Sequence, residues 1–95
     1  MVVGVVKLSL LVPESHSLKG KRKVIKRICE RLRHRFNVTV AEIDCQNLWQ
    51  ASEVGIAAVG NERGYVNSKL DKAINLVEEL HLAEIVDVQM EFINL

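Results

Sequence analysis

The chain has 95 residues, of which 48% are hydrophobic and 26% charged, with five glycines and one proline. This length and composition predict one globular domain, residues 1–95, with a single core, and leave no room for a second domain. The two cysteines lack the dense, even spacing of a disulfide framework, so we expect a cytoplasmic protein. The apolar run at residues 1–12 has no basic segment before it and no cleavage site after it, which favours a strand over a targeting or membrane segment.

The charges are unevenly distributed along the chain, although the formal net charge is only +1. Residues 19–35 hold nine basic residues against one acidic residue, Glu30, a local net charge of +8. The rest of the chain holds four basic and eleven acidic residues, a net charge of −7. The sequence therefore predicts a strongly dipolar molecule, in which one basic element lies on an acidic body.

The first half of the chain predicts a strand, a helix and a second strand. In residues 2–12 hydrophobic side chains alternate along the chain, which is typical of a strand with one buried face. Ser15 or Ser17 is suited to cap the helix predicted over residues 18–35, where apolar residues recur at helical spacing and nearly all charges lie outside their stripe. Residues 36–44 are rich in β-branched residues with a period of two, which predicts the second strand.

The second half predicts a strand, a helix and a last strand. A polar connection at residues 45–51 leads into a third strand at residues 52–59. A turn at residues 60–64 precedes a second amphipathic helix at residues 65–80, and residues 84–95 alternate again as a strand. The apolar face of this last strand is expected to hold Val86, Val88, Met90 and Phe92.

The element order β-α-β-β-α-β is typical of the ferredoxin-like α+β sandwich. In this fold a four-stranded antiparallel sheet carries both helices on one face. The right-handed crossover rule fixes the side that the helices cover and leaves the other sheet face open to solvent, a partner or a ligand. A two-layer α+β domain with another strand order is the alternative.

The predicted basic helix is the main candidate for a binding surface. Cations near a helix N-terminus cost about 0.3–1 kcal/mol each, and like charges four residues apart cost about 0.2–0.5 kcal/mol per pair. A bound polyanion would relieve this repulsion, so we predict a surface that contacts the phosphates of RNA, or less readily of DNA. The predicted contacts are Lys19, Lys21, Arg22, Lys23, Lys26, Arg27, Arg31, Arg33 and Arg35. The alternative is a solvated helix face whose cations pair with the acidic body of the domain or of a second copy.

RNA-recognition motifs share this order of elements but stack bases on aromatic residues of their central strands. The third strand predicted here, residues 52–59, contains no aromatic residue. We therefore expect RNA to bind the basic helix and its neighbouring loop rather than the sheet.

A second candidate surface surrounds the only tryptophan. Tryptophan is enriched among the residues that dominate protein interfaces, although a lone tryptophan also folds over the edge of a core. The predicted protein interface is Leu48, Trp49 and Gln50. An open sheet face bearing Val3, Val5 and Leu11 likewise points to a homodimer.

The sequence predicts no catalytic residue, no metal site and no cofactor. The three histidines share no metal-ligand spacing with either cysteine. Capping explains the serines of residues 15–17, and Glu42 with Asp44 do not by themselves make a carboxylate pair for acid–base chemistry. Acylphosphatases place an arginine in the loop after the first strand, and residues 13–17 contain none. An enzyme acting on a phosphorylated small molecule is therefore the third hypothesis.

Three segments carry a resemblance to a known family: SLKGKR at residues 17–22, FNVTVAE at residues 36–42 and LWQ at residues 48–50. With them the whole chain resembles the YlxP-like family of small bacterial proteins, a family of unknown function. The resemblance implies a ferredoxin-like fold and no catalytic residues. The genes of the family often lie among those for transcription termination, translation initiation and ribosome-binding factors, which implies a role near RNA or the ribosome. The positions that the resemblance emphasises are Ser17, Leu18, Lys19, Lys21, Arg22, Leu48, Trp49 and Gln50.

We therefore expect a non-enzymatic, cytoplasmic binding protein whose partner is RNA or the ribosome, with no cofactor and no membrane association. The alternative is a homodimeric protein-interaction module that has no nucleic-acid ligand.

Overall fold

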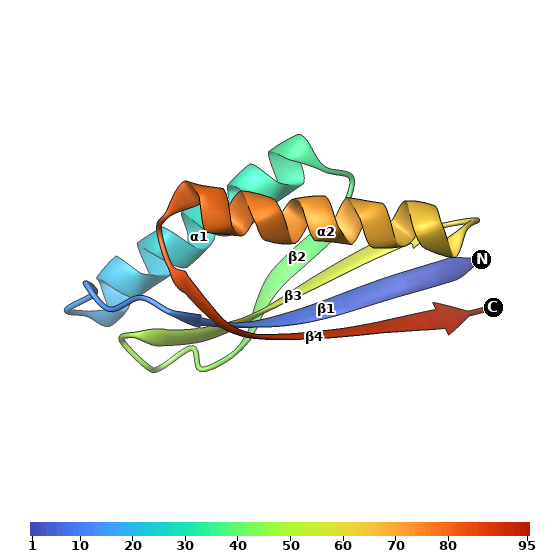
Figure 1. Cartoon of the computed structure of the whole chain (residues 1–95). Helices are drawn as coiled ribbons and strands as arrows, with labels where there is room; N and C mark the ends of the chain where they lie inside the picture. Colours follow the sequence, from blue (N-terminus) through green and yellow to red (C-terminus); the bar gives the residue numbers. More distant parts are fainter.

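The computed structural model describes residues 1–95 as two helices packed on one face of a four-stranded sheet (Figure 1). The elements in chain order are β1 (Val2–Leu11), α1 (Leu18–Arg35), β2 (Thr39–Asp44), β3 (Ala51–Gly60), α2 (Arg63–Leu80) and β4 (Glu84–Asn94). The strand order is β2-β3-β1-β4, and every neighbouring pair is antiparallel. This is the ferredoxin-like arrangement, so the predicted fold class is confirmed.

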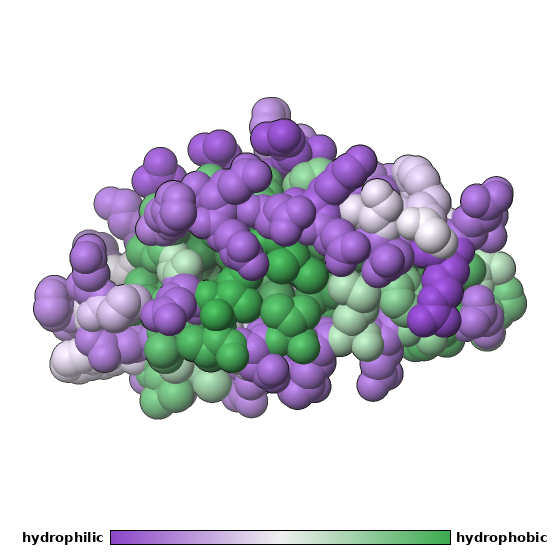
Figure 2. All heavy atoms as spheres, in the orientation of Figure 1, coloured by the Kyte–Doolittle hydropathy of each residue, from purple (hydrophilic) through white to green (hydrophobic).

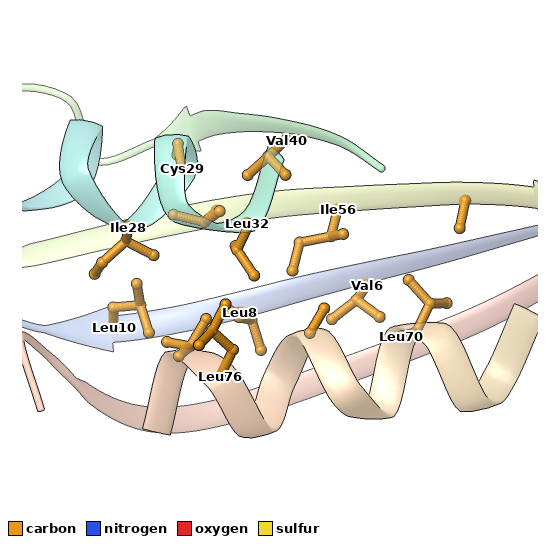
Figure 3. Close-up of a cluster of buried hydrophobic side chains, with 14 of the residues drawn as sticks. Val6, Leu8, Leu10, Ile28, Cys29, Leu32, Val40, Ile56, Leu70 and Leu76 are labelled. Atoms are coloured by element: carbon orange, nitrogen blue, oxygen red, sulfur yellow. The ribbon is translucent and has the colours of Figure 1, made fainter. Parts of the chain in front are cut away.

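The core lies between the helices and the inner face of the sheet. Strand β1 is central, and its alternate side chains, including Leu8 and Leu10, are almost completely buried. Figure 3 shows side chains from both helices, among them Ile28 of α1 and Leu76 of α2, pointing toward this strand. Burial of a side chain of this size contributes about 1.5–3 kcal/mol, so the alternation in β1 is enough to fix which face of the sheet the helices cover.

Helix α1 begins where its sequence supplies a cap. The Ser17 Oγ accepts a hydrogen bond from the Gly20 N–H at 3.0 Å, which satisfies one of the free donors of the first turn. Ser15, the other predicted cap, is buried and donates to the Ser17 carbonyl at 2.9 Å. Arg33 and Arg35 occupy the last turn, where their charges complement the helix dipole.

Two details of the strands differ from the expectation. Strand β2 begins at Thr39 rather than at residue 36. In β4 a register shift opposite Ser9 and Leu10 leaves Val86 without a partner on β1, and Ile85 pairs with Leu10 in its place. Val86 lies at this irregularity and is 51% exposed, so it adds little to the core.

Neither helix has an apolar stretch that could cross a bilayer. Hydrophilic residues cover the outer surface of both helices, and hydrophobic residues gather between α2 and the sheet (Figure 2).

Candidate nucleic-acid interface

Five exposed cations form one continuous row along α1. They are spaced four residues apart: Lys19, Lys23, Arg27, Arg31 and Arg35. Side chains at this spacing are neighbours on a helix surface, and sixteen residues of helix make the row about 24 Å long. No acidic residue interrupts it. Four like-charged neighbour pairs cost α1 about 1–2 kcal/mol in total, so the row destabilises the helix that carries it.

The remaining exposed cations of α1 lie beside this row and are partly engaged within the fold. The Lys26 ammonium lies 4.0 Å from the Glu30 carboxylate, at the limit of an ion pair, and both side chains are mostly exposed. An Arg33 Nη2 donates to the Val40 carbonyl at 2.7 Å and ties the end of α1 to β2. Arg22 is exposed and makes no such contact. Six of the nine predicted contacts thus have no partner within the domain.

The prediction was wrong for Lys21. Its side chain is completely buried, and its ammonium lies 3.1 Å from the Glu42 Oε2. It also donates to the carbonyls of Cys45 at 2.6 Å and Ala51 at 3.1 Å, so it is unable to reach a phosphate. The physical reason is its place on the helix. Lys21 precedes Ile25 by four residues and so begins the stripe that faces the sheet.

The partners of Lys21 form a polar cluster at this end of the core. The Glu42 Oε2 also accepts a hydrogen bond from the Ser52 Oγ at 2.5 Å, and Ser52 is buried on the inner face of β3. A register shift between Glu42 and Asp44 turns Asp44 away, where its Oδ1 accepts from the Cys45 N–H at 2.7 Å. The two carboxylates therefore do not form a pair for acid–base chemistry. We call the buried ion pair, Ser52 and the two bonded carbonyls the Lys21 clasp.

The β2–β3 loop, residues 45–50, is fixed to α1 and to the β1–α1 loop. Besides its bonds to Lys21, the loop is held by the Gln50 Nε2, which donates to the carbonyls of Pro13 and Ser15, both at 3.1 Å. The three predicted interface residues thus have different roles. The amide of Gln50 is used within the fold, whereas Leu48 and Trp49 are 52% and 57% exposed. Their use by a protein partner stays a prediction.

The open face of the sheet carries charge of the opposite sign. Strand pairing places Glu53, Glu84, Asp87 and Glu91 on this face, with Lys7 as its only cation. A polyanion is repelled by such a surface. The open sheet face is therefore mainly acidic, whereas α1, on the other side of the sheet, is strongly cationic.

Neither cysteine is suited to nucleophilic chemistry. Both are free thiols. Burial raises the pKa of Cys29 above its ordinary value, and desolvation followed by the nearby Asp44 carboxylate raises the pKa of Cys45. Both thiols therefore stay protonated at neutral pH, and the thiolate is the reactive form. No cluster of three or more His, Cys, Asp or Glu side chains could hold a metal ion.

The largest cavity, of about 590 Å³, lies between the β1–α1 loop and the connection from α2 to β4. His16 and His81 line it, together with Glu14 and Glu84. Its only hydroxyl belongs to Ser15 and is already donated to the Ser17 carbonyl. The cavity thus holds two possible bases but no side chain arranged to act with them as a nucleophile.

The polar contacts of the Lys21 clasp and of Gln50 join the segments that carried the resemblance to a family. A family model described as Protein of unknown function (DUF503) matches residues 3–90. The chain belongs to the DUF503 family. This DUF503 chain is also 34% identical over 77 residues to Uncharacterized protein YlxP of Bacillus subtilis. The match covers 81% of this chain and 84% of that protein. The resemblance to the YlxP-like family is thus confirmed.

Among solved structures, the de novo designed protein Foldit4 superposes on this chain with a TM-score of 0.56 and a sequence identity of 17%. The superposition covers 100% of this chain and 99% of the Foldit4 chain. This likeness shows the fold alone. Within the DUF503 fold, Ser17 and Lys21 of the first segment, Glu42 of the second and Gln50 of the third all have structural roles. The positions that the fold leaves free are Lys19, Arg22, Leu48 and Trp49.

Proposed function

We propose that this DUF503 protein is a non-enzymatic RNA-binding or ribosome-associated protein that contacts phosphates through α1. The observation that carries the proposal is the unbroken row of five exposed cations from Lys19 to Arg35. The domain contains only two ion pairs, Lys21 with Glu42 and Lys26 with Glu30. None of the cations in the row is therefore neutralised by the acidic residues of the same chain.

The physical basis is the release of counterions from a nucleic acid. Each phosphate neutralised on a single strand adds about 0.7 to the slope of log affinity against log salt, and about 0.9 on a duplex. Four or five contacts along the row therefore predict a slope of about −3 to −3.5 for single-stranded RNA. Phosphate contacts give affinity and orientation without reading the sequence, so little dependence on base sequence is expected from α1 alone.

The test is a titration of labelled single-stranded, duplex and structured ribosomal RNA at two salt concentrations. Lys23→Glu should weaken binding and reduce the salt slope. Lys72→Glu is the matched control, because it makes the same charge change at an exposed position of α2. Equal losses in the two variants would indicate a response to net charge alone, and no binding at low salt would refute the proposal.

A second candidate function is a homodimer that pairs along β4. Strand β4 is a sheet edge of 11 residues, and its outward backbone groups have no partner strand. Val86 and Val88 are 51% and 42% exposed. The hydrophobic residues between α2 and the sheet in Figure 2 lie along this side of the molecule. A second copy would cover them.

Sedimentation of the wild-type protein and of Val88→Lys tests this candidate. A dimer that dissociates in the variant would support pairing along β4. Dissociation in Trp49→Ala instead would place the contact at the β2–β3 loop, and a monomer in every case would refute the homodimer.

A further inference from the structure

The β2–β3 loop is fixed at both ends by groups that lie next to the start of α1. The Lys21 ammonium bonds to the carbonyl of Cys45 at one end of the loop and to that of Ala51 just beyond the other end. Within the loop, the Leu48 N–H donates to the Cys45 carbonyl at 3.1 Å. The first turns of α1 and the loop are thus no further apart than one lysine side chain, and Figure 1 shows them at the same end of the molecule.

This fixed loop presents the only tryptophan of the chain to solvent. Trp49 is 57% exposed and is not part of the hydrophobic core cluster or of the side chains packed against it. The fold therefore does not need the indole ring for its own packing. An exposed indole on a rigid backbone offers a flat face at little further cost in conformational entropy.

The charges around the loop favour approach from one side. On the α1 side, Lys19 and Arg22 are exposed and have no acidic partner. On the sheet side, Asp44 bonds to the loop backbone, and Glu53 lies on the open face. A polyanion that follows the cation row would therefore reach the end of α1 to which the β2–β3 loop is bonded, and Trp49 is the exposed aromatic residue of that loop.

From this juxtaposition we infer that Trp49 is a base-stacking site for single-stranded nucleic acid, at the end of the cationic row of α1. The inference rests on the proposed function and deepens it by naming the substrate class: a strand with at least one unstacked base. Proteins that bind single strands without reading sequence combine a cationic track with aromatic stacking. Here α1 and the β2–β3 loop supply these two parts, in place of the aromatic strands that the sheet lacks.

Trp49 also makes the experiment direct, because its fluorescence reports on this one position. The probes are a 12-nucleotide oligoadenylate, an abasic strand with the same number of phosphates, and a 12-base-pair RNA duplex. We expect oligoadenylate to quench the Trp49 emission and the abasic strand and duplex to leave it nearly unchanged. Trp49→Ala should weaken oligoadenylate binding by about 5-fold or more, which is the lower end of the effect of removing one stacked base.

The variants separate stacking from other roles of the loop. Trp49→Ala should bind the abasic strand with wild-type affinity and salt slope, since the phosphate contacts remain. Trp49→Phe should restore most of the lost affinity. Leu48→Ala, a neighbouring exposed residue without a flat ring, should bind oligoadenylate as the wild type does. Circular dichroism of each variant checks that the fold is kept.

The outcomes distinguish this inference from the function on which it rests. Oligoadenylate binding with a steep salt slope, but with unchanged emission and full affinity in Trp49→Ala, would overturn the stacking site and leave α1 as the binding surface. No binding of any probe at low salt would overturn both. Emission that changes with protein concentration in the absence of RNA would show that the loop contacts a second copy, and would also overturn the stacking site.

Discussion

Removing the ammonium of Lys21 should destabilise the protein far more than removing any exposed charge of the same helix. Lys21→Met keeps the apolar stem of the side chain, but it removes the cation that pairs with Glu42 and one donor to each of the carbonyls of Cys45 and Ala51. Breaking a buried ion pair from one side costs about 3–5 kcal/mol. A domain of 95 residues has a total stability of about 5–14 kcal/mol, so the change is a large share of the whole.

The assay is thermal and urea unfolding followed by far-ultraviolet circular dichroism. A loss of 3 kcal/mol predicts a fall in Tm of at least about 12 °C for a domain of this size. Arg22→Met is the control, since Arg22 is the exposed neighbour of Lys21 and its replacement should change stability by no more than about 0.5 kcal/mol.

A double-mutant cycle measures the coupling between Lys21 and Glu42 even if Lys21→Met is mostly unfolded. Lys21→Met combined with Glu42→Leu removes the unpaired carboxylate and should be more stable than Lys21→Met alone by at least about 1 kcal/mol. The double variant should stay less stable than the wild type, because the carbonyls of Cys45 and Ala51 still lack the Lys21 donor and the Ser52 hydroxyl loses its acceptor. A Lys21→Met loss under about 1 kcal/mol, or simple additivity in the cycle, would refute the clasp as a source of stability.

Three further outcomes follow from the structure. Arg27→Gln removes two pairs of like charges, those with Lys23 and Arg31, and should stabilise the protein by about 0.4–1 kcal/mol in low salt. The gain in stability should fade at high salt. A loss of stability in low salt would contradict the repulsion within the row. Gly4→Ala should cost about 1–3 kcal/mol in urea unfolding, because its Cβ would lie 2.6 Å from α2 side chains, whereas Gly64→Ala has nothing within 4 Å and should be tolerated. Iodoacetamide should modify Cys45 slowly at pH 7, because its raised pKa keeps the thiol protonated, and faster as the pH rises past the usual thiol pKa of about 8.5. The buried Cys29 should react only when the protein unfolds. Rapid reaction of Cys45 at pH 7 would contradict the raised pKa.

The sequence predicts the architecture because the patterns that specify it are local. Alternation in β1 and the Ser17 cap determine the first two elements, and the structure shows both. Lys21 was misassigned because its charge was counted with its neighbours. Its position four residues before Ile25 was the available signal, since it places the residue on the buried stripe.

The other differences depend on contacts between distant segments. The bulge at Val86 is revealed only by the pairing of β4 with β1. Glu42 was visible as an acidic residue on a strand, but its role requires α1 to lie above it. The position of the β2–β3 loop, which carries the exposed Trp49, likewise depends on bonds between segments more than twenty residues apart, which no local pattern encodes.

The central position of β1 has a consequence for synthesis of the chain. Both neighbours of β1 are made after it: β3 is complete at Gly60 and β4 only at Asn94. At about 5–20 residues per second, the interval between the two is about 2–7 seconds. Throughout that time the most apolar strand of the protein has one unpaired edge. A chain stalled or cut before residue 84 would keep that edge permanently, and we expect it to aggregate or to require a chaperone.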